Sequence, residues 1–135
     1  MKMIKSFMKT LIVTVEMDDS LALVKDIFDH TNFHHLLVVE QKKLKGVISD
    51  RDLLKALSPD IGTLAELPRD TATLKKRAHQ IMTRTPFTLS PDATLTDAVD
   101  LLLEHRVSCI PIINASQEIE GIITFRDLLP ALKAL

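Results

Sequence analysis

The chain has 135 residues and a formal net charge of −1, with 46% hydrophobic and 26% charged residues. This balance is typical of one globular unit or two small lobes, and its field is too weak to favour nucleic acid or an anionic membrane. Trp and Tyr are absent, so a base-stacking surface is not expected. Cys109 is the single cysteine, which excludes an intramolecular disulfide and a Cys-rich metal site. No membrane span or signal peptide is visible, so we expect a cytoplasmic location.

An internal repeat organises the chain. The sequence from Gly121 to Leu129 reads GIITFRDLL, and the sequence from Gly46 to Leu54 reads GVISDRDLL. A shift of 74 positions places Met8 on Met82, and one extra residue in the second copy raises the shift to 75 for Gly46 and Gly121. The glycine is expected to end a turn before a short buried strand, and the paired leucines open a helical pattern. Matches in order over most of the chain indicate a duplication.

The two copies follow the same expected order of elements. In the first copy these are an extended segment at 11–15, N-cap residues at 18–20, a helix at 21–30, strands at 36–39 and 44–48 around a turn at 40–43, and a helix at 52–57. In the second copy they are an extended segment at 87–89, a helix that follows Asp92, strands at 110–113 and 119–123 around a turn at 114–118, and a last helix from about Asp127 with Pro130 in its first turn.

Residues 58–77 belong to neither copy and contain Pro59, Gly62 and Pro68. We expect a turn of helix at 63–67 and a helix at 70–81. The basic triplet at 75–77 is either a solvated face or an anion or partner contact. Each copy is too small to bury a robust core alone. The expected fold class is therefore α/β, of the α+β kind, with two β-α-β-β-α repeats packed sheet to sheet in pseudo-two-fold symmetry. The expected domains are 1–57 and 78–135, joined by a linker at 58–77.

Each copy places a hydroxyl, an arginine and an aspartate where a strand runs into a helix, namely Ser49, Arg51 and Asp52, and Thr124, Arg126 and Asp127. A Ser or Thr three residues before an acid is also the pattern of a helix capping box, so plain capping is one interpretation. The other is nucleotide binding, because helix amides and an arginine attract phosphate and a carboxylate can accept hydrogen bonds from both ribose hydroxyls. The arginine and the duplication go beyond the needs of capping and favour a nucleoside phosphate.

With these motifs the chain resembles a tandem pair of CBS (cystathionine-β-synthase) domains, a Bateman module, of the stand-alone bacterial type. The resemblance rests on the G-I-I-T-x-x-D motif at 121–127 with V-S-C-I-P at 107–111 upstream, and it covers 7–57 and 81–132. It implies an adenine ligand (AMP, ADP or ATP, with S-adenosylmethionine or NAD as further candidates) in the clefts between the repeats. It also implies a homodimer and an unknown regulated protein, without a nucleic acid or membrane partner.

Carried over by position, the resemblance implies two sites. Site A has a phosphate and ribose side made of Ser49, Arg51, Asp52, His34 and His35, and an adenine wall made of Met82, Pro86, Phe87, Thr88, Val107 and Ser108. Site B would use Thr124, Arg126, Asp127, Ser108 and Cys109, with Met8, Ile12, Val13, Thr14, Phe33 and His34 around the base.

The first copy departs from the second at three positions near the expected sites. Leu37 stands where the second copy has Pro111, and the pair His34-His35 stands where it has Ser108-Cys109. In some members of the family this position carries basic residues that reach phosphate, so the resemblance favours site A for a charged ligand and leaves occupancy of site B open. For the histidines, an ordinary surface role, a phosphate contact and metal binding remain alternatives; neighbours on a strand point to opposite faces, which disfavours joint chelation.

The leading functional interpretation is a regulatory module that senses an adenine nucleotide and is not an enzyme. The sequence shows no Gly-rich phosphate loop and no nucleophile with a base, and Cys109 is expected to be a small apolar filler. The alternative is a structural or protein-interaction module that binds no nucleotide. A third hypothesis is a nucleotide hydrolase, for which nothing in the chain places a base or a metal.

Overall fold

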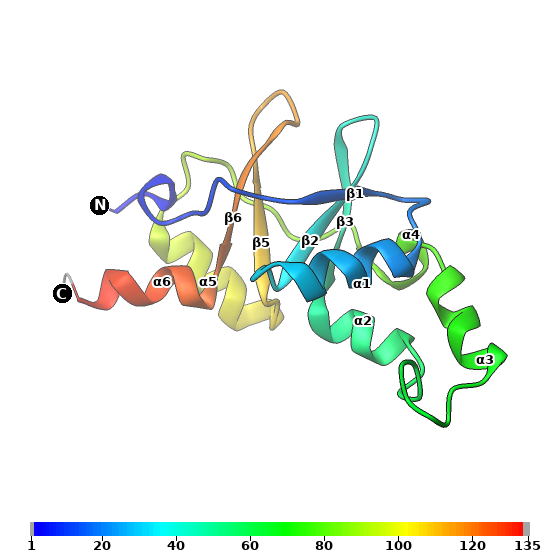
Figure 1. Cartoon of the computed structure of the whole chain (residues 1–135). Helices are drawn as coiled ribbons and strands as arrows, with labels where there is room; N and C mark the ends of the chain where they lie inside the picture. The colour runs from blue at the N-terminus through cyan, green and yellow to red at the C-terminus, as the bar shows by residue number, and fades with distance from the viewer. Residues whose placement is uncertain (1, 134–135) are drawn as a thin grey trace. The chain divides into compact units, whose positions relative to one another are not determined.

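A computed structural model describes residues 2–133 of the chain (Figure 1). Its contacts divide these residues into two compact units. The N-terminal unit holds residues 13–41 and 45–84, and the C-terminal unit holds 85–133 together with 42–44 and the described residues up to Ile12. Each unit therefore draws residues from both copies of the repeat.

The N-terminal unit contains a four-stranded sheet in the order β1-β2-β3-β4. Its main elements are β1 (Thr14–Glu16), α1 (Leu21–His30), β2 (His35–Glu40), β3 (Lys43–Ser49), α2 (Asp50–Ala56) and β4 (Thr83–Arg84) (Figure 1). Strand β1 runs parallel to β2 with α1 as the crossover, and β4 runs antiparallel to β3 with Thr83 opposite Val47. The expected hairpin turn is confirmed: Gln41 and Lys42 both have positive φ, of 51° and 66°, as a primed two-residue turn requires.

The C-terminal unit repeats this order in a shorter form. It contains a 3-10 turn (Ile4–Ser6), α5 (Leu95–His105), the antiparallel pair β5 (Cys109–Ile113) and β6 (Ile119–Thr124), and α6 (Phe125–Leu132). Single bridges extend the pair on both sides, since Leu89 lies parallel to Ile112 and Lys9 lies antiparallel to Ile122. Lys9 thus occupies beside β6 the place that Thr83 occupies beside β3.

Each unit has a separate hydrophobic core that includes a residue from the segment contributed by the other repeat, which is called the exchanged segment below. In the N-terminal unit Met82 is 8% exposed and packs with Val15, Leu21, Val24, Leu36, Val38, Ile48, Leu53 and Ala78. In the C-terminal unit Ile4 is fully buried and packs with Ala98, Leu102, Ile110, Ile112 and Ile123. Because Met82 and Ile4 are buried, the hydrophobic effect holds each exchanged segment on its sheet.

The repeated glycines do not end turns, contrary to the sequence expectation. Gly46 lies inside β3 and Gly121 inside β6, each beside an exchanged segment. A Cβ atom at Gly46 would lie 2.7 Å from the Thr83 carbonyl oxygen, and one at Gly121 would lie 2.5 Å from the Lys9 carbonyl oxygen. Both distances are too short for a side chain, so the glycines permit the close approach of a neighbouring backbone.

The helix expected at 70–81 is wrong as a continuous element. It is divided into α3 (Pro68–Thr71), a 3-10 turn (Ala72–Lys75) and α4 (Ala78–Ile81). The break occurs because the backbone at 76–78 pairs with the start of α1: Leu21 N–H donates to the Lys76 carbonyl and Ala78 N–H donates to the Asp19 carbonyl, each at 2.8 Å. Within the basic triplet, Arg77 Nη1 donates to the Asp18 carbonyl at 3.0 Å. The turn of helix expected at 63–67 is also wrong, because these residues form non-helical turns.

Asp70 organises the segment between the repeats. Its carboxylate accepts from the Ser58 hydroxyl and from the Leu67 N–H, both at 2.7 Å, and its side chain is buried. The hydrogen bond from Ser58, together with that from Leu67, holds the pKa of Asp70 below its usual value despite the opposing effect of burial. The segment is therefore tied to the end of the first repeat.

The last helix begins two residues earlier than expected. Because α6 starts at Phe125, Pro130 lies inside the helix and not in its first turn. At this interior position the proline ring removes one backbone hydrogen bond of the helix.

The helix at 21–30 is confirmed with its cap, since Ser20 Oγ accepts from Leu23 N–H at 3.3 Å. Within residues 2–133, no helix has the length and apolar character needed to cross a membrane.

Candidate functional site

The first joint lies where β3 runs into α2, in the N-terminal unit. Ser49 has an extended conformation and caps the helix: its Oγ accepts from Asp52 N–H at 3.1 Å, and Asp52 Oδ2 accepts from Ser49 N–H at 2.9 Å. This reciprocal pair is a capping box, which explains why α2 begins at Asp50 and not at the expected Asp52. Asp52 is partly buried and borders a shallow cavity of about 250 Å³ with Lys55, Ala56 and Ile81.

The second joint lies where β6 runs into α6, in the C-terminal unit. Here the Thr124 N–H and the Thr124 hydroxyl both donate to Asp127 Oδ2, at 2.8 and 3.0 Å. Lys9 Nζ lies 3.6 Å from Asp127 Oδ1. Asp127 is only 7% exposed, so three donors surround a nearly buried carboxylate. The sequence reasoning missed Lys9, although the shift that matches Met8 with Met82 also places Lys9 on Thr83, which lies at the equivalent place beside the first joint.

His34 contacts the first joint through the carboxylate of Asp50. Its Nδ1 lies 2.9 Å from Asp50 Oδ2, and the Asp50 N–H donates to the His34 carbonyl at 3.0 Å. Burial alone would raise the pKa of Asp50, but the hydrogen bond from His34 and the positive charge of the histidines hold it below its usual value. Among residues 2–133, no three His, Cys, Asp or Glu side chains are arranged to hold a metal ion.

The two arginines lie on the first turns of their helices and are exposed. Arg51 follows the first residue of α2, and Arg126 follows the first residue of α6. A guanidinium beside helix amides is a suitable donor for a phosphate group. Both joints therefore combine a hydroxyl, a fixed carboxylate and an accessible guanidinium within four residues of chain.

Cys109 lies opposite Thr124 in the β5–β6 pair and is buried. Burial raises the pKa of its thiol to about 12, and the negative charge of Asp127 adds to the rise. A thiol with this pKa is protonated at neutral pH, so Cys109 is not equipped to act as a nucleophile. The apolar character expected from the sequence agrees with its burial.

Each expected site takes residues from both units. For site A, the N-terminal unit carries Ser49, Arg51, Asp52, His34, His35 and Met82, and the C-terminal unit carries Pro86, Phe87, Thr88, Val107 and Ser108. For site B, the C-terminal unit carries Thr124, Arg126, Asp127, Cys109, Met8 and Ile12, and the N-terminal unit carries Val13, Thr14 and Phe33. The Phe87 ring stacks on His105 with its centroid 4.0 Å away, a contact that the sequence did not indicate.

A duplicated strand–helix joint on two related sheets defines a class of chain built from paired α+β repeats. The family model for the CBS domain matches the chain twice, over residues 4–59 and 78–134. The chain therefore belongs to the CBS domain family, and the resemblance inferred from its sequence is confirmed.

Two relatives illustrate the range of proteins whose sequences are similar to this chain. Uncharacterized protein MJ1426 of Methanocaldococcus jannaschii is 28% identical, and the match covers 96% of this chain and 90% of that protein. The inosine-5'-monophosphate dehydrogenase of Nitrosopumilus maritimus is 32% identical over 85% of this chain but only 21% of its own length. The chain thus matches almost the whole of one relative and a minor part of the other.

Solved structures confirm the fold as a CBS domain pair. CBSX2 in complex with AMP has a TM-score of 0.81 at 24% identity, covering 99% of this chain and 98% of that one. The CBS domain pair of protein MJ0100, in complex with 5-methylthioadenosine and S-adenosyl-L-methionine, has a TM-score of 0.80 at 22% identity, covering 98% and 97%. The cytosolic domain of the Mg2+ channel MgtE in complex with ATP has a TM-score of 0.73 at 20% identity, covering 96% of this chain and 48% of that one.

Proposed function

We propose that this chain is a regulatory module that binds an adenine nucleotide of the AMP, ADP or ATP class. The observation that carries the proposal is the duplicated joint, in which a hydroxyl, an exposed arginine and a positioned aspartate follow a buried strand. Family membership supports it, as do the neighbours in complex with AMP, with ATP, and with 5-methylthioadenosine and S-adenosyl-L-methionine. S-adenosylmethionine and NAD remain further candidate ligands.

The proposed sites are those expected from the sequence, on the repeats at 1–57 and 78–135 that the linker at 58–77 joins. Asp52 and Asp127 would accept the ribose hydroxyls, and Arg51 and Arg126 would donate to phosphate. Site A is proposed as the stronger site for a charged ligand. The Asp52 carboxylate accepts a hydrogen bond from the Ser49 N–H, whereas Asp127 is surrounded by two donors of Thr124 and by Lys9.

Nucleotide binding is tested by thermal unfolding against AMP, ADP, ATP, S-adenosylmethionine and NADH, with guanine nucleotides as controls. A binder gains about 2.7 kcal/mol at a ligand concentration one hundred times Kd. Asp52→Ala should abolish most of this gain. The matched control is Asp97→Ala, because Asp97 forms the same reciprocal cap with Thr94 at the start of α5 but lies outside both proposed sites. Full ligand stabilisation in both Asp52→Ala and Asp127→Ala would reject the ribose assignment.

The phosphate assignment is tested with Arg51→Ala. Removal of the guanidinium should weaken AMP more than adenosine, because only AMP offers a phosphate to the lost donor. Equal losses for the two ligands would place the arginine outside the phosphate site. Arg126→Ala is the matched variant for site B.

A second candidate function is a structural or protein-interaction module that binds no nucleotide. The caps favour it, because Asp52 and Asp127 already accept hydrogen bonds from Ser49 and Thr124. It predicts no thermal shift with any nucleotide. We further propose that the chain acts without catalysis, which incubation with ATP and assay of released phosphate would test. The homodimer, the regulated protein and the cytoplasmic location likewise stay predictions.

A further inference from the structure

The rings of Phe87 and His105 stack on each other in the C-terminal unit. Their centroids lie 4.0 Å apart, and the angle between the two ring planes is 20°. Phe87 nevertheless remains 44% exposed, and His105 is exposed as well. An exposed aromatic ring whose orientation is already set by a neighbour can receive another flat group by stacking.

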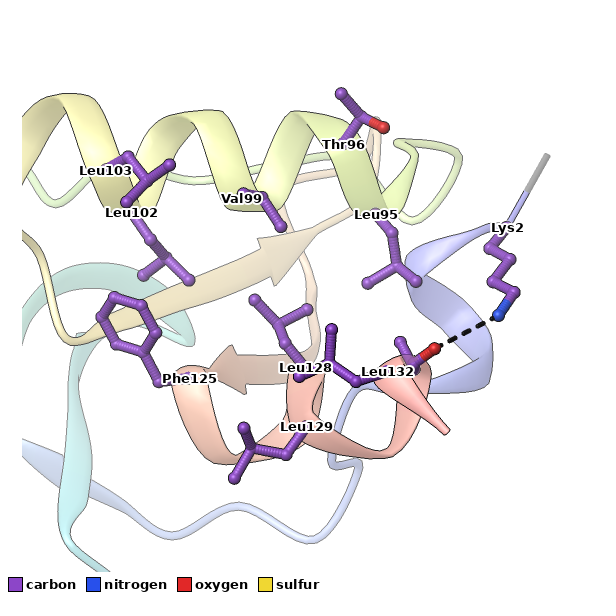
Figure 2. A pocket seen from close by; sticks show the side chains of 11 residues that line it. Lys2, Leu95, Thr96, Val99, Leu102, Leu103, Phe125, Leu128, Leu129 and Leu132 are labelled. Carbon is purple, nitrogen blue, oxygen red and sulfur yellow. Dashed lines mark hydrogen bonds between the residues drawn. The ribbon is translucent and has the colours of Figure 1, made fainter. Parts of the chain in front are cut away.

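Helix α5 gives His105 a fixed position. His105 is the last residue of this helix, and Arg106 ends it in the left-handed conformation with a φ of 52°. The helix is anchored by Leu102, which is 2% exposed. Figure 2 shows Leu102 pointing from α5 into the apolar groove that also receives Leu128 of α6. Because its helix is held on the core, the His105 ring is a firm support.

Phe87 lies on an extended segment, two residues before the point where that segment pairs with β5. There the Leu89 N–H donates to the Pro111 carbonyl at 3.2 Å, and the Ile113 N–H donates to the Leu89 carbonyl at 3.0 Å. The Phe87 side chain projects before this anchor, so its rotamer depends on what the ring contacts. A side chain that must be ordered on binding lowers the affinity, whereas one that is already held does not.

The other repeat provides an internal comparison for the stacked pair. By the shift of 74 positions, Val13 corresponds to Phe87 and Thr31 to His105. Thr31 uses its hydroxyl to donate to the Ile27 carbonyl at 2.7 Å. The N-terminal unit is thus built without rings at these two positions, so the fold itself does not require the stack.

We propose that His105 is a positioning residue of site A, which holds the Phe87 ring as a stacking surface for the adenine base. Phe87 contacts the base, and His105 acts through Phe87. Imidazole suits this support, because its flat ring stacks on phenylalanine while its nitrogens stay in water. Stacking of a base on an aromatic ring is favourable, and at site B the corresponding Val13 offers no ring. The inference rests on the proposed binding of an adenine nucleotide.

The test measures AMP and adenosine binding to His105→Ala by calorimetric titration. We expect the dissociation constants of both ligands to rise by the same factor of about three to ten, because one side chain must now be ordered against the base that they share. His105→Phe restores a flat ring and should recover most of the wild-type affinity. His30→Ala is the matched control, because His30 ends α1 as His105 ends α5 and lies outside both proposed sites.

A double-mutant cycle with Phe87→Leu separates positioning from folding. Leucine keeps the wall apolar but offers no ring, so His105→Ala should have no further effect on AMP binding in this background. Wild-type affinity in His105→Ala, no recovery in His105→Phe, or an undiminished loss in the Phe87→Leu background would overturn the inference alone. A wild-type chain that binds neither AMP nor adenosine would overturn the proposed function together with it, so the two failures are distinguishable.

Discussion

Both joints contain a hydroxyl side chain and an aspartate, but the surroundings of the aspartate differ. Asp52 is partly buried, borders a shallow cavity and accepts from the Ser49 N–H. Asp127 is almost fully buried, accepts two hydrogen bonds from Thr124 and lies 3.6 Å from Lys9 Nζ. The duplication has therefore kept the local backbone geometry while the charge around the carboxylate has diverged. A ligand at the second joint would have to share Asp127 with Lys9, and a ligand at the first would meet no equivalent lysine, because Thr83 takes that place.

The largest expected effects come from the two glycines beside the exchanged segments. Gly46→Ala and Gly121→Ala should each lower the free energy of unfolding by about 1–3 kcal/mol, because a Cβ would meet a backbone carbonyl that cannot move without its strand. Gly121→Ala should cost at least as much as Gly46→Ala, since its Cβ would lie 2.5 Å from a backbone oxygen against 2.7 Å at Gly46, where the other close atom belongs to the flexible Met82 side chain. Urea unfolding measures both, and a neutral result would show that the segments are not held this closely.

The next effect compares the two caps. Asp127→Ala should destabilise the chain by about 2 kcal/mol, because it leaves the Thr124 donors without their acceptor in a nearly buried place. Asp52→Ala should cost about 1 kcal/mol, the usual loss for a cap that is partly exposed. Thermal and urea unfolding of both variants would check the order. If Asp52→Ala were the more damaging, the difference in burial would not control the strength of the two caps.

A smaller effect is expected from Lys9→Met. Lys9 is largely exposed, so its loss should change stability by less than about 1 kcal/mol. Nucleotide binding should respond more clearly, because the second joint would lose the positive charge beside Asp127. The affinity for AMP should fall relative to the affinity for adenosine in calorimetric titrations. Lys5→Met is the control, since Lys5 has the same exposure and pairs with Asp92 instead. Equal responses of the two variants would remove Lys9 from the second joint's binding function.

The smallest effect concerns Asp50, which only the first joint has. Its pKa lies below the usual 3.8 because His34 donates to it, so His34→Gln should raise the pKa towards that value. A carboxyl group whose pKa is lower in the folded than in the unfolded protein stabilises the fold at every pH above its unfolded pKa. This stabilisation is lost as the pH falls through the folded pKa. Carboxyl NMR titration of both proteins would detect the change. An unshifted Asp50 would mean that the His34 contact does not persist in solution.

The sequence predicted the repeat from matches in order along the chain. It also predicted the order of the elements and the capping residues of both joints, because these depend on patterns within a few residues. It could not show that Thr83 and Lys9 lie beside β3 and β6, since pairing between distant segments leaves no local pattern. It misread the glycines for the same reason: the neighbour that requires them is remote in sequence. The break at Lys76 was also hidden, because the partner of its carbonyl is the Leu21 N–H at the start of α1.

The apolar stripe of α5 was visible in the sequence, but its burial was not. Periodicity placed Leu95, Val99, Leu102 and Leu103 on one helix, and only the structure separates the buried Leu102 from the exposed Leu103.

The bridge between Lys9 and Ile122 also has a consequence for how the chain reaches its folded state. Lys9 is synthesised long before Ile122, the residue of β6 with which it pairs. During translation Ile4, which is fully buried in the finished C-terminal unit, has no core to enter. Contacts of such long sequence separation slow folding, because a large loop must close before they can form. The C-terminal unit therefore cannot be completed until β6 has been synthesised.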